Sequence, residues 1–322
     1  MTPPRLVAVA ALALFAAACA STPPPDPRFR PSENVLEIVA VLRRHIPDDT
    51  YRFEPARDVS GRNVYRGSLL RLENLEKVHE GALRAGHYDD VVAFAKGRAL
   101  ERLRAFELAA QQYRHVSERT PELQHEALKS AALNDSLAEA ARIGFDAARP
   151  PAADDDVLAP PPKDEKGMVE ASDKRIALLE ALAPQAEGTH YTIIIKEEIE
   201  RADMARAGWF VASRRLTADG DVRALSEQQR LVLAHRESKL ANTHVLGLAD
   251  LYAALADDYV RSHPPEGLLF DPPTFQELVD SASRLYQSVA GQDGTPEKLA
   301  ATQRLEAFLA FTMKVDSDRF TQ

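Results

Sequence analysis

Residues 89–121 read DDVVAFAKGRALERLRAFELAAQQYRHVSERTP. The stretch contains a single glycine, Gly97, and its only proline is the terminal Pro121. Most of its other residues are Ala, Leu, Glu, Gln and Arg, which favour the α-helix. The pattern predicts two helices, at about residues 88–103 and 105–119. Because so short a connection separates them, the two helices must pack antiparallel as a hairpin.

Helical patterns continue on both sides of this stretch. Ser32 is a predicted N-cap of a helix that Pro47 stops, and apolar residues at three- and four-residue spacing predict another helix from Tyr65 to Ala82. Thr120-Pro121-Glu122 opens a fifth helix. Four to six longer helices are predicted further on, with starts at Ser172, Thr189, Ser226, Pro272 and Thr295 and a kink or new start at Ala241-Asn242-Thr243. The predicted fold class is therefore all-α.

A proline-rich and acidic segment separates two groups of helices. Residues 149–167 contain Pro150-Pro151, Asp154 to Asp156 and Pro160 to Pro162. Proline clusters and like charges do not pack into a core. The segment predicts a linker between a domain of helical hairpins at residues 32–148 and a helical bundle at residues 168–322.

The hairpin at residues 88–121 resembles a degenerate tetratricopeptide repeat. In that family the second helix carries an alanine, an aromatic residue four positions later, a small residue three positions after that, and a proline five positions further on. In this chain, these positions hold Ala109, Tyr113, Val116 and Pro121. Gly97 matches the position of a small residue in the family's first helix. Ala93 and Lys96 stand where the family has large apolar residues, and no second copy lies 34 residues away. The resemblance implies a protein-binding helical surface; an ordinary helical hairpin is the alternative.

The N-terminus has the features of an export signal. Arg5 precedes 13 apolar residues, Leu6 to Ala18, a run too short to span a bilayer. Ala16 to Cys19 resembles the bacterial lipobox, which implies removal of residues 1–18 and lipid attachment to Cys19. Residues 19–31 then form a proline-rich tether.

This resemblance also implies a location. Ala20, rather than Asp, follows the cysteine, which implies an outer-membrane anchor facing the periplasm. The alternative is ordinary cleavage at Ala16-x-Ala18, which would release a soluble protein.

Composition limits the partners. The whole chain carries a formal charge of −9, and removal of Arg5 leaves −10. An acidic balance argues against nucleic acid as a partner and against adhesion to anionic lipid. Cys19 is the only cysteine, so no intrachain disulfide can form.

Several charged groups are candidates for chemistry. Two Glu-x-x-His pairs, Glu76 with His79 and Glu122 with His125, are similar to the motif of di-iron bundles. The remaining carboxylates, Glu101 and Glu107, occur in the wrong order for such a site, so we expect solvated faces. Metalloprotease, nucleophile-elbow and phosphate-loop motifs do not occur. The sequence thus predicts no catalytic, cofactor-binding or metal residues.

Two histidines in the C-terminal half are close in sequence. Nine residues separate His235 and His244, and a continuous helix would place them on opposite sides. They could not share a metal ion unless the helix breaks at Asn242. The charged run from Lys196 to Arg201 predicts a solvated face, and Trp209-Phe210 predicts core packing.

Two functional hypotheses follow. The first is a lipid-anchored, non-enzymatic helical scaffold that binds proteins of the cell envelope. Helical-repeat lipoproteins of this general kind act in outer-membrane assembly, secretin assembly or activation of cell-wall synthases. The alternative is an enzyme or metal-binding bundle whose site is assembled from residues far apart in sequence.

Overall fold

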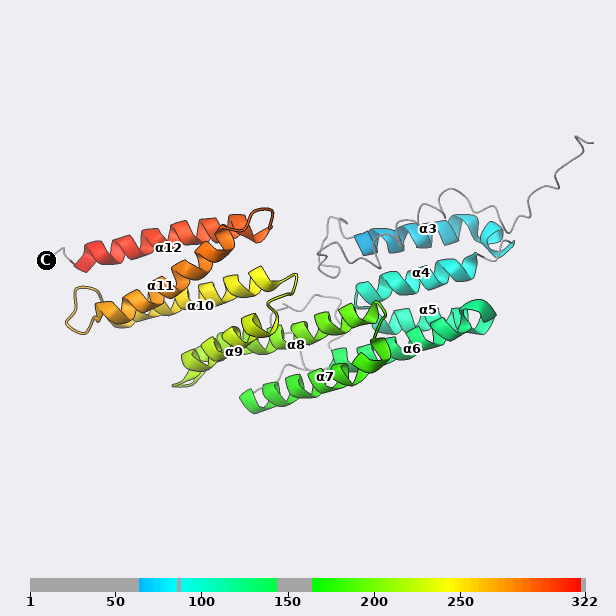
Figure 1. The fold of residues 1–322 in the computed structure, drawn as a ribbon, viewed down its shortest axis with the longest axis horizontal. Helices are drawn as coiled ribbons and strands as arrows, with labels where there is room; N and C mark the ends of the chain where they lie inside the picture. The colour runs from blue at the N-terminus through cyan, green and yellow to red at the C-terminus, as the bar shows by residue number, and fades with distance from the viewer. Residues whose placement is uncertain (1–63, 86–87, 144–163, 320–322) are drawn as a thin grey trace, which may run out of the picture. The chain divides into compact units, whose positions relative to one another are not determined.

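The computed structural model describes residues 64–85, 88–143 and 164–319. These residues form ten α-helices and a short 3-10 helix, and they contain no strand (Figure 1). The predicted all-α fold class is confirmed. The predicted signal peptide, Cys19, the tether and the helix after Ser32 lie outside the described residues, as does most of the predicted linker.

The chain divides into two compact units, Met1–Asp135 and Ser136–Gln322. The division falls within a helix, 14 residues before the start of the predicted linker. The described part of the first unit contains α3 (Val64–Ala85), α4 (Asp89–Arg102), α5 (Phe106–Arg119) and the first part of α6 (Pro121–Arg142). The predicted bounds of the α4–α5 hairpin are correct to within one residue.

The α4–α5 hairpin closes around one aromatic side chain. Tyr113 is fully buried, and it shares a face of α5 with Ala109 and Val116, which are also fully buried. A Cβ atom added at Gly97 of α4 would lie 2.7 Å from the Tyr113 ring. The absence of a side chain at Gly97 therefore sets how closely the two helices approach.

The second unit is a series of consecutive antiparallel helices. It contains α7 (Glu165–Ala186), α8 (Tyr191–Ser213), the 3-10 helix η2 (Arg214–Leu216), α9 (Gly220–Ala234), α10 (Ala241–Ser262), α11 (Pro272–Ala290) and α12 (Glu297–Arg319). Each of these α-helices packs on the next in sequence, and α10 also contacts α12 (Figure 1).

Two predicted helix starts in this unit are wrong. Ser172 lies buried inside α7, which begins seven residues earlier, where Asp164 accepts a hydrogen bond from the Gly167 N–H at 2.7 Å. Ser226 lies inside α9, which begins at Gly220. In both cases another residue ends the preceding loop, so the serine hydroxyl is not needed as a cap.

The other predicted starts agree with the structure. Thr189 Oγ1 accepts the Tyr191 N–H at the start of α8, at 3.3 Å, and Asp271 caps α11 directly before Pro272. A new helix begins at Ala241, which is one of the two alternatives predicted for that segment. The final helix, predicted to end at about Val315, extends to Arg319.

Helices α10, α11 and α12 enclose an apolar core. Its buried aromatic side chains are Phe275, Tyr286 and Phe308, and Phe311 packs against them. On α10, Leu248, Leu251 and Leu255 are buried, whereas Tyr252 and Tyr259 are partly buried. Among the described residues, no helix is long and apolar enough to cross a membrane.

Candidate functional site

The turn between α9 and α10 brings two histidines together. Helix α9 ends at Ala234, where the His235 N–H donates to the Leu231 carbonyl. Ser238 Oγ then accepts the Leu240 N–H at 3.0 Å, and α10 starts at Ala241. The continuous helix that would separate the histidines is therefore absent, and the ring centroids of His235 and His244 lie 6.1 Å apart.

Each of these histidines contacts a carboxylate of α8. His244 Nε2 lies 2.5 Å from Glu200 Oε1, and His235 Nε2 lies 2.8 Å from Asp203 Oδ2. Glu200 and Asp203 are three residues apart, which places them on one face of the helix. Glu200, Asp203 and His244 are buried, and the His235 side chain is 14% exposed.

Two arginines extend the cluster toward α7. Arg230 of α9 donates hydrogen bonds to two carboxylates, from Nη1 to Asp203 Oδ1 at 2.8 Å and from Nε to Glu227 Oε2 at 2.9 Å. Arg206 of α8 joins Glu227 to Asp173 of α7, at 2.7 Å and 3.0 Å.

A network of ionisable groups therefore extends over four helices, α7 to α10, and the α9–α10 turn. We call it the charge ladder; its members are Asp173, Arg206, Glu227, Arg230, Asp203, His235, His244 and Glu200.

Two carboxylates of the ladder, those of Glu200 and Asp203, are stabilised in their charged form. Burial alone raises the pKa of Glu200, but hydrogen bonds from His244 and Ser238 outweigh it, so this pKa lies below its ordinary value. Burial likewise raises the pKa of Asp203, and hydrogen bonds from His235 and Arg230 outweigh it. Both carboxylates are thus held as anions by the donors that the fold places against them.

A second buried ion pair lies on the neighbouring face of α8. Arg175 Nη2 of α7 donates to Glu198 Oε2 at 2.9 Å, and both side chains are at most 4% exposed. The prediction of a solvated charged face at Lys196 to Arg201 is therefore wrong for Glu198 and Glu200. Ile194 and Ile195 are buried next to them, because α8 packs against both α7 and α9.

The sequence does contain a signal for these buried charges, although the spacing of the charged run alone does not reveal it. Apolar residues occur all around α8, at Ile193 to Ile195, Ile199, Ala202 and Phe210. A helix that is apolar on every side lies inside a protein. Its charged residues must then be buried with partners.

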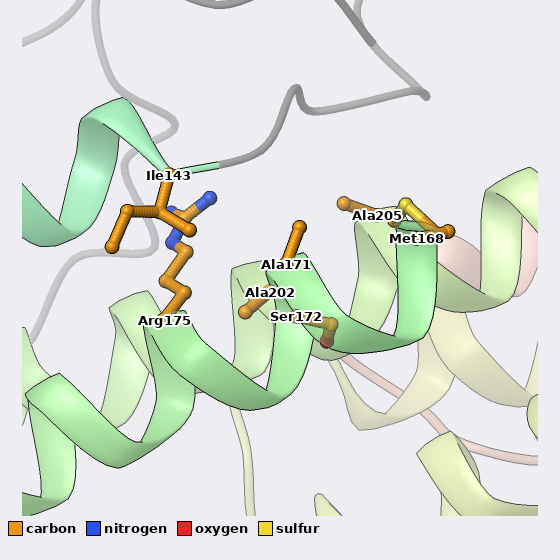
Figure 2. Close-up of a pocket in the computed structure, with 7 residues that line it drawn as sticks. All are labelled: Ile143, Met168, Ala171, Ser172, Arg175, Ala202 and Ala205. Atoms are coloured by element: carbon orange, nitrogen blue, oxygen red, sulfur yellow. The ribbon is translucent and has the colours of Figure 1, made fainter. Parts of the chain in front are cut away.

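A small hollow between α7 and α8 lies near this ion pair. Its lining includes Met168, Ser172 and Arg175 of α7, Ala202 and Ala205 of α8, and Ile143 (Figure 2). Its volume of about 10 Å³ is room for one water molecule. Ser172 Oγ is buried without a hydrogen-bond partner among the described residues, so a water there would satisfy it.

The predicted Glu-x-x-His pairs do not meet. Glu76 of α3 binds Lys96 of α4, with 2.8 Å between Oε2 and Nζ, and His79 lies at a kink of α3. Glu122 and His125 are exposed on α6, as expected for a solvated face. In the described ranges, no three His, Cys, Asp or Glu side chains are arranged to hold a metal ion.

Glu101 has a structural place in the first unit. Its carboxylate is 1% exposed and accepts hydrogen bonds from Tyr113 Oη at 2.9 Å and Asn134 Nδ2 at 3.2 Å. Arg98 Nη1 also lies 3.3 Å from it. The hydroxyl of the central aromatic residue is therefore satisfied by a buried anion, which the sequence pattern does not indicate.

The structure defines an all-α protein of consecutive antiparallel hairpins, with a partly buried charge ladder in its second unit. No protein-family model matches this sequence, and a comparison with curated proteins finds no match either.

Proposed function

We propose that this protein is a lipid-anchored helical scaffold that faces the periplasm and binds another protein of the cell envelope. The anchor is inferred from Arg5, the apolar run, Cys19 and the proline-rich tether. In this proposal the tether holds a helical body away from the membrane, where a partner can reach it.

One observation carries the binding half of the proposal. The loop between α10 and α11 exposes two consecutive leucines, Leu268 at 104% and Leu269 at 79%. The end of α12 lies beside this loop, because Arg319 stacks over the Phe270 ring at 5.6 Å, and Met313 of α12 is also exposed. Two large apolar side chains exposed next to each other in one loop favour an interaction surface.

The fold provides a rigid support for such a surface. Pro264, Pro265, Pro272 and Pro273 flank the loop, and Tyr259 Oη accepts the Asp271 N–H at 2.7 Å. Tyr259 also packs against Phe270, with 5.7 Å between the ring centroids. A loop held in this way presents its leucines without a large ordering cost on binding.

Site-directed photo-crosslinking in the native envelope tests the proposal. A photo-reactive residue placed at Leu268, or separately at Met313, is expected to capture the same envelope protein. The matched control position is Gln276 of α11, an exposed polar residue of the same unit, which should capture nothing discrete.

Three results would contradict the scaffold. One is equal capture from all three positions, and another is no discrete product from any of them. The third is stoichiometric iron or zinc in the purified protein, which would favour the alternative of a metal-binding bundle or enzyme.

A further inference from the structure

One side of α12 is exposed to solvent and carries five residues that we call the α12 face: Glu306, Ala307, Ala310, Met313 and Lys314. We propose that this face binds the same face of a second copy of the chain, with the two helices antiparallel about a twofold axis at Ala310. The proposal concerns α12 alone and depends on neither the lipid anchor nor the envelope partner. Met313 is also a position tested for that partner, so a second copy and the partner compete for it.

The α12 face is a single stripe of the helix. Successive residues of an α-helix are about 100° apart, so all five residues point within about 60° of the direction of Ala310. On the opposite side four residues are buried, and that side packs against α11 and α10. The face is therefore exposed along its whole length.

Apolar exposure distinguishes α12 from the other described helices. Met313 is 72% exposed and Leu299 is 67% exposed, and Leu309 is exposed as well. No other described helix exposes three large apolar side chains. Exposure of this kind favours an interaction surface.

The order of the residues makes the α12 face complementary to itself. In an antiparallel pair centred on Ala310, each residue lies opposite the residue of the second copy that is equally far from Ala310 in the other direction. Glu306 and Lys314 are each four positions from Ala310, so Glu306 of each copy meets Lys314 of the other. Ala307 and Met313 are each three positions away, so each methionine packs over an alanine.

The charges favour this arrangement over others. A parallel pair in register would set Glu306 against Glu306 and Lys314 against Lys314, and like charges repel. Within one chain these two residues are eight positions apart, which is about 12 Å along the helix axis and too far for an ion pair. Neither forms an ion pair elsewhere in the described residues, so both charges are free to pair between copies.

The interface is small, because each copy contributes one helix. Interfaces of this size give weak dimers, and we expect a dissociation constant of about 10–100 μM. Since the two ion pairs lie near solvent, the dimer should weaken as salt is added.

Sedimentation equilibrium of the purified full chain tests the proposal. Every sample carries Cys19→Ser, so that no acyl chain contributes to association. Glu306→Lys and Lys314→Glu each set like charges against each other at both symmetry-related pairs, so each should raise the dissociation constant at least about tenfold. The matched control Glu277→Lys makes the same charge change at an exposed site on α11 and should leave the dissociation constant unchanged.

A mixture of the two single variants tests the antiparallel register directly. One variant has two positive charges on the α12 face and the other has two negative charges, so a pair made of one of each regains both ion pairs. The mixture should dimerise with about the dissociation constant of the unsubstituted face, although neither variant does so alone. The double variant Glu306→Lys/Lys314→Glu exchanges both charges and should dimerise as well.

A chain with the unsubstituted face that stays monomeric up to millimolar concentration would overturn the proposal. So would single variants that dimerise as readily as that chain, or a mixture that associates no better than either variant alone.

Discussion

Tyr113 shows how a single residue determines a hairpin. Its ring fills the space that Gly97 leaves open, and its hydroxyl binds the buried carboxylate of Glu101. The apolar and polar parts of one side chain therefore contribute separately to the stability of the first unit.

Two substitutions separate these contributions. Tyr113→Ala should cost about 3–5 kcal/mol of unfolding free energy, because it empties a buried aromatic site. Tyr113→Phe should cost about 1–3 kcal/mol, because it keeps the ring but removes a donor from a buried anion. Urea unfolding measures both, with the exposed Gln111→Ala as the control. Equal losses for Phe and Ala would show that ring packing contributes nothing.

At Gly220, the packing of the backbone leaves no room for a side chain. A Cβ atom at this position would lie 1.8 Å from the Arg214 carbonyl oxygen, so Gly220→Ala must displace the 3-10 turn before α9. We expect a loss of about 3 kcal/mol, measured by the urea midpoint. Gly81→Ala is the comparison, since nothing lies within 4 Å and a helical alanine should stabilise by about 0.5–1 kcal/mol. Similar effects at both glycines would contradict this view.

At the scale of elements, α8 organises the second unit. It packs between α7 and α9, and its buried acidic residues pair with Arg175, Arg230 and the two histidines. Helix existence could be predicted from apolar periodicity, as for α5 and α10. The starts of α7 and α9 could not, because the choice among Asp164, Ser172, Gly220 and Ser226 depends on loop contacts that form only in the folded chain.

The histidine cluster was beyond sequence reasoning for a similar reason. On a continuous helix, two side chains nine residues apart lie on opposite sides. When a turn interrupts the helix between them, the same spacing can bring them together. The segment Ala241-Asn242-Thr243 predicts a kink or a new helix start, but the segment from His235 to Leu240 lacks proline and glycine, so the sequence does not decide between these alternatives. The break follows from the packing of both α9 and α10 against their neighbours.

The lowered pKa values of Glu200 and Asp203 predict that the folded protein loses stability at acid pH. Because folding depresses both values, their stabilisation is present above about pH 4, the unfolded value, and is lost as the pH falls through the folded values. Asp203→Asn should flatten the fall in urea midpoint between pH 5 and 2.5. Asp316→Asn, at an exposed site on α12, should leave it unchanged. If the urea midpoint of Asp203→Asn fell between pH 5 and 2.5 as steeply as that of the wild type, this role of Asp203 would be refuted.

At the scale of the whole molecule, sequence predicts an accessible segment between the two groups of helices. Residues 149–163 include Ala152, Ala153, Val157 and Leu158 among prolines and aspartates. Elastase, whose pocket accepts small apolar residues, should cut there first. Mass spectrometry of the fragments checks the position. First cleavage within α8 or α10 would contradict the predicted linker.

We propose that lipid on Cys19 anchors the protein, and the most direct test is the intact mass and membrane partitioning of the wild-type protein beside Cys19→Ser. We expect a wild-type mature chain that begins at Cys19, carries acyl chains and fractionates with membranes, because several acyl chains make anchoring stable. We expect Cys19→Ser to be unacylated and to leave the membrane fraction. A wild-type protein without added mass, or a Cys19→Ser protein that stays in membranes, would contradict the lipid anchor.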